Sequence, residues 1–284
     1  MKKTAFIVGS GYVGSVAADL FKLSNYQVWS GRRTAKGGTD LSLDVLRPES
    51  FPKELLQAEI VIYCVAADAS KDEAYRLAYV EGLKNVLTAL EQESKKLTRF
   101  IFVSSTGVYA QNEGEEIDED SLTSPTNFSG IRLLEGEALL KALGSKATAV
   151  RFSGIYGPGR EGIIQEVTSG REFAAQRLDT YSNRIHRDDC ARLLLFLSET
   201  KQLKPIYIGS DRAPALTKEI VNWLGEKLSY PIKNYSVKIS QNLEGGVRAR
   251  GNKRCSSALI CLQGFEFIYP TYKEGFSQIL ADRA

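Results

Sequence analysis

Three glycines near the start of the chain have the spacing of a dinucleotide-binding turn. Gly9, Gly11 and Gly14 form G-x-G-x-x-G directly after an apolar run and at the start of a helical pattern, which is the context that gives this motif its meaning. The first glycine permits a tight turn, the second lets the backbone approach a pyrophosphate, and the third lets helix and strand pack closely. The pyrophosphate would then lie at the helix N-terminus. We expect this turn, with Tyr12 and Val13, to bind a dinucleotide; the alternative is a tight turn without a ligand.

The residues after the second apolar run bear on which dinucleotide is bound. An acidic residue there would bond the ribose hydroxyls of NAD, whereas an arginine would pair with the 2′-phosphate of NADP. Arg32 and Arg33 follow this run, without a carboxylate beside them, and a guanidinium offers a fork of donors to phosphate oxygens. The turn therefore predicts NADP, with NAD less favoured and an exposed basic turn as the alternative. Asp44 and Val45 follow the expected third strand, where an aspartate can accept a hydrogen bond from adenine; the alternative there is a strand-end turn.

The composition argues against several other classes of protein. The 284 residues carry 37 Lys and Arg against 34 Asp and Glu, without a basic block or an aromatic stripe, which disfavours nucleic-acid binding. His186 is the only histidine and the four cysteines form no CxxC pair, so no metal site is expected, and the acidic run 113–120 is expected to be a solvated loop. No apolar run reaches the length of about 18 residues that spans a membrane. We expect a cytoplasmic protein with reduced thiols and a small-molecule substrate.

The elements that must position these residues alternate along most of the chain. Short, mostly unalternated apolar runs are typical of parallel strands covered on both faces; they lie at 5–8, 27–30, 60–65, 100–104, 147–152 and 205–208. Helical patterns fall between them, and two later helices are expected at about 188–198 and 218–228. This alternation predicts an α/β fold, a doubly wound Rossmann parallel sheet with a smaller C-terminal substrate lobe. We assign residues 1–152, completed by about 183–210, to the nucleotide-binding part, and 153–182 and 211–284 mainly to the substrate lobe.

Several longer motifs resemble those of extended short-chain dehydrogenases/reductases, the NAD(P)-dependent epimerase/dehydratase group. The matching stretches cover nearly the whole chain and are GSGYVG (9–14), Val65-Ala66-Ala67, VSSTGVYA (103–110), RFSGIYGPGR (151–160), NRIHRDD (183–189) and KRCSS (253–257). The GSGYVG form is similar to the atypical branch of this superfamily. The resemblance implies NAD(P)-dependent chemistry, with Ala66 and Ala67 beside the cofactor. It also implies a homodimer formed through the two long helices that flank the sheet, with a monomer as the alternative.

The same resemblance implies a catalytic group of a serine or threonine, a tyrosine and a lysine. In that family the tyrosine exchanges a proton with the substrate oxygen and the lysine lowers its pKa. Ser105 matches the serine. Where Tyr-x-x-x-Lys belongs, one alignment places Phe128 and Arg132, and the other places Ser129 and Leu133. Neither alignment restores the pair, because phenylalanine has no ionisable group and arginine cannot readily act as a base.

Two hypotheses about function remain. In the first, the chain is an oxidoreductase or an epimerase/dehydratase-like enzyme in which Ser105 holds the substrate oxygen. Arg132 then binds an anionic substrate group or supports the nicotinamide ribose, and Tyr109 or Tyr156 supplies the proton; the alternative for each tyrosine is a packing role. Tyr156 and Arg160, in the YGPG loop, would contact a nucleotide sugar or a small carbonyl or hydroxy compound, substrate classes that follow from the resemblance. In the second hypothesis the chain binds NADP without turnover and acts as a regulator or partner.

Overall fold

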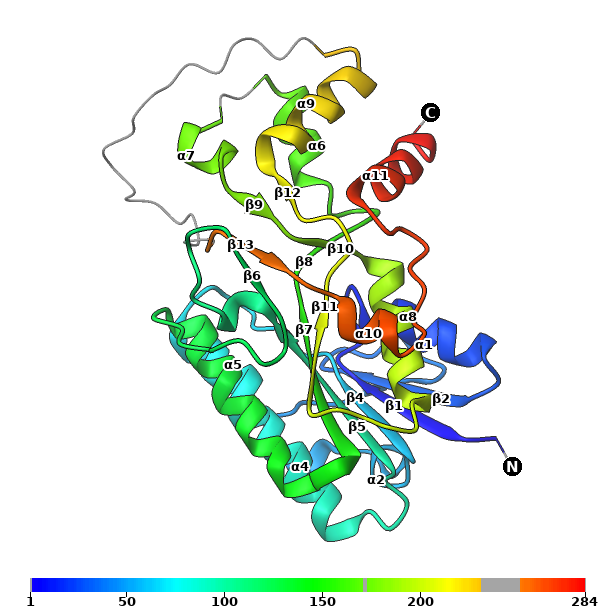
Figure 1. Ribbon diagram of the computed structural model, residues 1–284. Coiled ribbons are helices and arrows are strands. Elements are labelled where there is room, and N and C mark those ends of the chain that lie inside the picture. Colours follow the sequence, from blue (N-terminus) through cyan, green and yellow to red (C-terminus); the bar gives the residue numbers. More distant parts are fainter. Residues whose placement is uncertain (1, 171–172, 231–250, 284) are drawn as a thin grey trace.

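A parallel sheet forms the centre of the molecule, whose computed structural model describes residues 2–170, 173–230 and 251–283 (Figure 1). Its seven strands have the order β11-β7-β5-β4-β1-β2-β3, and every neighbouring pair is parallel. The strands are β1 (Thr4–Val8), β2 (Gln27–Arg32), β3 (Asp40–Ser42), β4 (Ile60–Tyr63), β5 (Arg99–Ser105), β7 (Ala147–Phe152) and β11 (Ile206–Gly209). The predicted Rossmann sheet is therefore confirmed, and each predicted apolar run forms one of its strands.

Helices cover both faces of this sheet (Figure 1). One face carries α1 (Gly14–Leu23) and α8 (Arg187–Glu199), and the other carries α4 (Gly82–Glu93) and α5 (Phe128–Leu139). The shorter helical segments of this part are η1 (Pro48–Ser50), α2 (Lys53–Leu56), α3 (Asp72–Arg76), the π-helical η2 (Leu77–Glu81), η3 (Thr106–Val108) and η4 (Leu140–Lys146). The helix predicted at about 188–198 is present as α8.

The side chains of each strand alternate between two apolar cores. In β4, Ile60 and Ile62 lie in the core beneath α1 and α8, whereas Val61 and Tyr63 lie in the core beneath α4 and α5. All four side chains are buried. A strand with helices on both faces must be apolar at every position, which explains why the apolar runs of the sequence do not alternate with polar residues.

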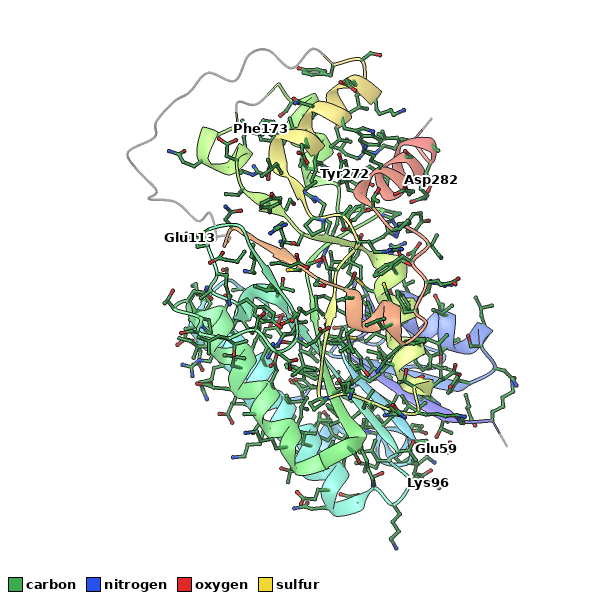
Figure 2. All side chains as sticks on the ribbon, viewed as in Figure 1. Glu59, Lys96, Glu113, Phe173, Tyr272 and Asp282 are labelled. Atoms are coloured by element: carbon green, nitrogen blue, oxygen red, sulfur yellow. The ribbon has the colours of Figure 1, made fainter. Side chains whose placement is uncertain are left out.

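A smaller lobe begins directly after β7 and lies above the sheet in Figure 1. Phe173 and Tyr272, labelled in Figure 2, belong to its apolar core, together with Ile164, Leu224 and Phe276. Its elements are β8 (Gly154–Tyr156), α6 (Gly162–Thr168), α7 (Ala175–Leu178), β9 (Tyr181–Ser182), β10 (Arg184–His186), β12 (Ala215–Leu216), α9 (Thr217–Lys227) and α11 (Tyr272–Ala281). The helix predicted at about 218–228 is present as α9.

Residues 251–265 contact both parts of the molecule. The Tyr181 amide donates to Asn252 Oδ1 at 2.9 Å and the Cys255 amide donates to Asn183 Oδ1 at 2.7 Å, which join this stretch to the smaller lobe. β13 (Lys253–Cys255) pairs with β6 (Glu115–Ile117), which lies within the acidic run expected to be a solvated loop. Ile260 of α10 (Ala258–Leu262) and Phe265 lie in the core beneath α1 and α8. The division into two parts stays a prediction, and this stretch joins the two parts.

Three other expectations concern the cysteines, membrane-spanning helices and metal sites. Cys64, Cys190, Cys255 and Cys261 are free thiols, and burial raises the pKa of Cys64 to about 12. Over residues 2–170, 173–230 and 251–283, no helix is long and apolar enough to cross a membrane. In the same ranges, no group of three or more His, Cys, Asp and Glu side chains could hold a metal ion.

Asp211 is a buried carboxyl group just after β11. Its side chain is 1% exposed, and Oδ1 accepts a hydrogen bond from the Ala213 amide at 3.1 Å. Oδ2 has no hydrogen-bond partner within the described residues. Burial raises the pKa of Asp211 to about 8, although the Ala213 amide and the Arg184 guanidinium act in the opposite direction. The folded state therefore favours the protonated form of this group.

We expect this carboxyl to make the protein less stable as the pH rises. A raised pKa in the folded state stabilises the fold below the unfolded pKa of about 3.9, and this stabilisation is lost as the pH rises toward 8. The loss is at most about 1.4 kcal/mol for each pH unit. Asp211→Asn cannot ionise, so its stability relative to the native protein should increase from pH 5 to pH 8 in urea titrations. A difference that stays constant over this range would contradict the prediction.

Candidate active site

The glycine turn has the three steric features expected of it. Gly9 has φ 95°, and a Cβ there would lie 2.8 Å from the Cys64 carbonyl carbon. A Cβ on Gly14 would lie 2.2 Å from the Gly9 carbonyl oxygen. A Cβ on Gly11 would meet nothing within 4 Å. The protein itself therefore needs glycine at the first and third positions, whereas the second faces open space at the N-terminus of α1.

Arg32 lies beside this turn and is held there by hydrogen bonds. Its Nε donates to Ser10 Oγ at 2.9 Å, and its Nη2 donates to the Ser10 carbonyl oxygen. Asp40 lies behind it, with Oδ2 at 3.5 Å from Nε. Although burial acts to raise it, hydrogen bonds from Ser10 and Ser30 hold the pKa of Asp40 below its ordinary value. Arg32 is thus a positioned cation over an ionised carboxylate.

Sequence reasoning missed Asp40, because only the residues directly after the second strand were considered. Asp40 lies on β3, which pairs with β2 so that Ser30 and Asp40 are opposite each other. Because β3 is short and only partly buried, no apolar run in the sequence marks it or shows that Asp40 lies opposite Ser30.

Arg33, the next residue, forms an exposed ion pair with Asp68. Its Nη1 and Nη2 donate to both carboxylate oxygens of Asp68, at 2.8 Å and 2.5 Å. Both side chains are about two-thirds exposed, at 64% and 65%. Asp68 directly follows Ala66 and Ala67 in the loop after β4. The ion pair therefore joins two of the segments predicted to bind the cofactor.

Asp44 and Val45 follow β3 in a turn that the protein itself stabilises. Asp44 Oδ1 accepts a hydrogen bond from the Leu46 amide at 3.0 Å. Val45 is half-buried on the core beneath α4 and α5, and its carbonyl accepts a hydrogen bond from Asn85 Nδ2 at 3.0 Å. These contacts place both residues near the edge of the sheet, where the predicted adenine contact remains a prediction.

Ser105 ends β5 and begins the short helix η3. Its Oγ accepts a hydrogen bond from the Gly107 amide at 3.1 Å. The side chain is half-buried. Because the amide occupies an acceptor position, the hydroxyl hydrogen remains able to donate to a substrate oxygen.

Tyr109 lies deeper, in a buried network behind Ser105. Its hydroxyl accepts a hydrogen bond from Arg151 Nη1 at 2.7 Å. Arg151 also pairs with Glu137 at 2.6 Å, and Ser104 Oγ donates to the same carboxylate at 2.6 Å. Burial raises the pKa of Tyr109 to about 12. The network joins β5, β7 and α5, so Tyr109 is positioned to stabilise the end of the sheet.

The YGPG loop forms a tight turn against the glycine turn. The Arg160 amide donates to the Gly157 carbonyl at 2.9 Å, and Gly159 has φ 82°, as glycine in the third position of a type II turn does. The Tyr12 hydroxyl donates to the Pro158 carbonyl at 3.1 Å. The guanidinium carbon of Arg160 lies 4.3 Å from the centroid of the Tyr12 ring. The structure therefore brings Arg160 to the glycine turn.

Tyr156, in contrast, is part of the core of the smaller lobe. Its ring packs on His186 and Phe276, with centroid distances of 5.3 Å and 4.6 Å. A Cβ on Gly275 would lie 1.9 Å from its hydroxyl oxygen, and burial raises the pKa of this phenol. The hydroxyl thus lies against the backbone of α11.

Comparison with known proteins connects this geometry to a family. A model of the family described as NAD dependent epimerase/dehydratase matches residues 5–209. The chain belongs to this family. Membership makes it an epimerase/dehydratase-like enzyme with a nicotinamide cofactor, as the motif resemblance implied.

Three solved structures share the fold over nearly the whole chain. A candidate NAD-dependent epimerase/dehydratase of Methylobacillus flagellatus is 32% identical over 99% of this chain and 98% of its own, with a TM-score of 0.79. The UDP-N-acetylglucosamine 4-epimerase of Bacillus cereus is 14% identical over 100% of both chains, with a TM-score of 0.80. MoeE5, in complex with UDP-glucose and NAD, is 20% identical over 99% and 98% of the chains, with a TM-score of 0.77. The last two show the fold alone. A search of curated proteins finds no match.

In this epimerase/dehydratase, one face of α5 packs on α3. Arg132 donates to Asp72 from Nε at 2.7 Å and from Nη2 at 3.0 Å, and to Glu135 from Nη1 at 2.9 Å. The ring of Phe128 lies 5.4 Å from that of Tyr75. Each nitrogen of the Arg132 guanidinium therefore donates to a carboxylate, and no described contact joins Arg132 to Ser105.

The other face of α5 packs on the sheet. Leu133 lies in the core beneath α4 and α5, and Glu137 accepts hydrogen bonds from Ser104 and Arg151. Ser129 precedes Leu133 by four residues and shares its face, since residues four apart lie one above the other on a helix. Of the two alignments, the one that places Ser129 and Leu133 at the Tyr and Lys positions therefore gives residues that face β5.

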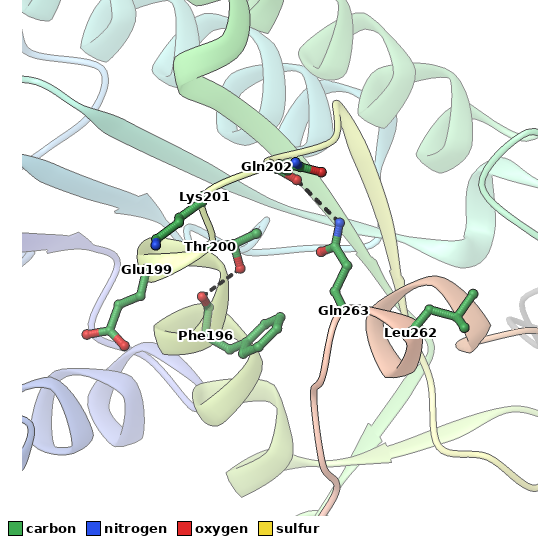
Figure 3. Close-up of a pocket in the computed structure, with 7 residues that line it drawn as sticks. All are labelled: Phe196, Glu199, Thr200, Lys201, Gln202, Leu262 and Gln263. Carbon is green, nitrogen blue, oxygen red and sulfur yellow. Dashed lines mark hydrogen bonds between the residues drawn. The ribbon is translucent and has the colours of Figure 1, made fainter.

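A surface hollow of about 480 Å³ lies at the far end of α8 (Figure 3). Glu199, Thr200 and Gln263 line it. The glycine turn lies at the opposite end, since Arg187 at the start of α8 contacts Tyr12. The 13 residues of α8 correspond to about 20 Å at 1.5 Å for each residue. This hollow is therefore separate from the candidate active site.

Proposed function

We propose that this protein is an NADP-dependent epimerase/dehydratase-like enzyme that acts on a nucleotide sugar or a small carbonyl or hydroxy compound. The observation that carries the proposal is the open face of Gly11 beside the positioned guanidinium of Arg32. Gly9, Gly11, Tyr12, Val13 and Gly14 would bind the pyrophosphate. The adenosine half would lie between Asp44, Val45, Ala66 and Ala67.

The arginines after β2 support NADP over NAD. Arg32 is held in place by Ser10 and presents its charge over Asp40, whose oxygens already accept bonds from protein groups. A 2′-phosphate could replace Asp68 as the partner of Arg33. This exchange would cost little, because an exposed ion pair contributes only about 0–1 kcal/mol.

Ser105 is the residue that we propose for catalysis. When bound, the nicotinamide ring supplies or accepts a hydride. The Ser105 hydroxyl would donate to the substrate oxygen while its Oγ accepts from the Gly107 amide. The hydroxyls of Tyr109 and Tyr156 are engaged by Arg151 or buried against α11, so we propose packing roles for them. Arg132, held by Asp72 and Glu135, would stabilise the contact between α3 and α5.

The proposed substrate class follows from the relatives. The Bacillus cereus protein is an epimerase of UDP-N-acetylglucosamine, and MoeE5 was found with UDP-glucose. We also propose that the protein is cytoplasmic, which agrees with its free thiols, and that it forms a homodimer through α4 and α5.

A second candidate function is an NADP-binding regulator without turnover. It is favoured by Ser129 and Leu133, which supply neither a phenol nor an amine.

Replacing Arg32 and Arg33 together with alanine should remove the preference for NADPH. We expect the ratio of NADPH to NADH affinity to fall by roughly 100-fold, because each charge-assisted bond to phosphate contributes about 1.5–3 kcal/mol and 1.4 kcal/mol is a factor of 10. Isothermal titration with both cofactors measures the ratio. An unchanged ratio would sink the assignment of these residues to the 2′-phosphate.

Ser105→Ala tests the enzyme against the regulator. Panels of UDP-sugars, carbonyl compounds and hydroxy compounds should be tested for net cofactor reduction or oxidation and, by chromatography, for conversion of the substrate. The second readout is needed because an epimerase or dehydratase returns the hydride to the substrate and leaves the cofactor unchanged. We expect the native protein to turn over a panel member and the variant to lose roughly 100-fold or more in kcat, within the range for loss of a positioned proton donor. NADPH affinity should stay within about twofold. Tight NADPH binding without any turnover would support the regulator, and a fully active variant would refute the role of Ser105.

A further inference from the structure

Two arginines from different parts of the chain meet on the glycine turn. The guanidinium carbons of Arg160 and Arg187 lie 4.3 Å and 5.2 Å from the centroid of the Tyr12 ring. Arg160 comes from the tight turn after β8, and Arg187 is the first residue of α8. Tyr12 lies between Gly11 and Gly14, so both cations lie beside the glycine turn.

Gly157 shows how closely these three segments approach. A Cβ at this position would lie 2.9 Å from the Tyr12 hydroxyl and 3.1 Å from Arg187 Cβ. The Tyr12 hydroxyl also donates to the Pro158 carbonyl. The glycine turn, the turn at 157–160 and the start of α8 are therefore fixed relative to one another.

The two guanidinium groups keep donors available for a ligand. Stacking on an aromatic face leaves the N–H groups at the edge of the guanidinium plane. Arg160 is exposed and forms no ion pair with a carboxylate in the described part of the chain. Arg187 Nε donates to Asp188 at 3.1 Å, which leaves its two terminal nitrogens.

We infer that Arg160 and Arg187 bind the pyrophosphate of the dinucleotide from the side opposite the glycine backbone. A pyrophosphate at the N-terminus of α1 carries negative charge that backbone amides only partly balance, and paired guanidinium forks suit its oxygens. The inference rests on the proposed cofactor function and assigns Arg160 to the cofactor instead of the substrate. It also gives Tyr12 a role, because its ring orients both cations.

Binding measurements with ligands that carry one phosphate feature each test this inference. NADPH has both a 2′-phosphate and a pyrophosphate, NADH has only the pyrophosphate, and 2′-AMP has only the 2′-phosphate. We expect Arg160→Ala and Arg187→Ala each to weaken NADPH and NADH by the same factor, roughly tenfold. The affinity for 2′-AMP should stay within about twofold.

Two control variants and a check of folding separate loss of the pyrophosphate contact from loss of charge or of structure. Lys96→Ala removes one positive charge from an exposed site on the opposite side of the molecule from the smaller lobe (Figure 2) and should leave all affinities unchanged. Arg160→Lys keeps the charge without the planar fork and should lose part of the affinity, which separates stacking from net charge. Circular dichroism confirms that each variant is folded.

Several results would overturn the inference. NADPH and NADH affinities within twofold of the native values in both alanine variants would refute it. If the alanine variants lost affinity for UDP but kept their affinity for NADPH and NADH, the arginines would belong to the diphosphate site of a nucleotide-sugar substrate. That result would also refute the inference. A native protein that binds neither dinucleotide would instead refute the proposed cofactor function, which the native titration decides before any variant is made.

Discussion

Gly11→Val should abolish cofactor binding while leaving the fold intact. The Gly11 Cβ position meets no heavy atom within 4 Å, and its φ lies outside the left-handed region that favours glycine. The new side chain would occupy the space through which the pyrophosphate approaches the backbone. We expect a loss of NADPH affinity of roughly 100-fold or more and an unfolding free energy within about 1 kcal/mol of the native value.

Gly14→Ala is the matched variant for this experiment. Its Cβ would lie 2.2 Å from the Gly9 carbonyl oxygen, a backbone atom that cannot move away without displacing the turn. We expect this variant to lose about 1–3 kcal/mol of stability, as overpacking does. NADPH titrations and urea denaturation of both variants check the pair. A destabilised Gly11→Val protein, or one that still binds NADPH tightly, would contradict an open ligand-facing position.

The buried ion pair between Arg151 and Glu137 gives the largest expected effect on stability. Both side chains are 6% exposed, and the carboxylate accepts bonds from Arg151 and Ser104. Glu137→Gln leaves the guanidinium of Arg151 buried without a counter-charge. Removal of one partner from a buried pair costs about 3–5 kcal/mol, so we expect a loss of this size in urea denaturation.

Glu135→Gln is the control on the same helix. Glu135 pairs with Arg132 and is 41% exposed, so the loss should be within about 1 kcal/mol. Replacing both buried partners, as in Arg151→Met with Glu137→Leu, should cost less than Glu137→Gln alone, since no buried charge is left unpaired. Equal losses for Glu137→Gln and Glu135→Gln would show that the buried pair does not stabilise the sheet.

The sheet and its main helices could be predicted from the sequence because each strand is apolar on both faces. Ile60–Tyr63 is buried throughout, so a continuous apolar run marks it. β3 has no such run, since Asp40–Ser42 lies at the edge of the sheet and is only partly buried. The pairing of Lys253–Cys255 with Glu115–Ile117 has no sequence signal either, because both segments are short and mostly charged.

The candidate site could be predicted only where local chain geometry determines it. The glycine turn depends on adjacent residues, and its steric features agree with the motif. The partners of Arg32 and Arg33 are Asp40 and Asp68, which belong to other strands and loops. The orientation of Arg132 depends on how α5 is rotated about its axis, and an alignment ambiguous by one residue changes that rotation by about 100°.

The packing of residues 251–265 on the sheet has a consequence for synthesis of the chain. Ile260 and Phe265 lie in the core beneath α1 and α8, and Cys255 of β13 lies in the core beneath α4 and α5. On the ribosome the sheet strands emerge first, but the apolar surface that receives these residues stays exposed until they have been translated. The core beneath α1 and α8 therefore cannot be completed until residue 265 of the 284 has been translated, and a chaperone has access to that surface throughout this time.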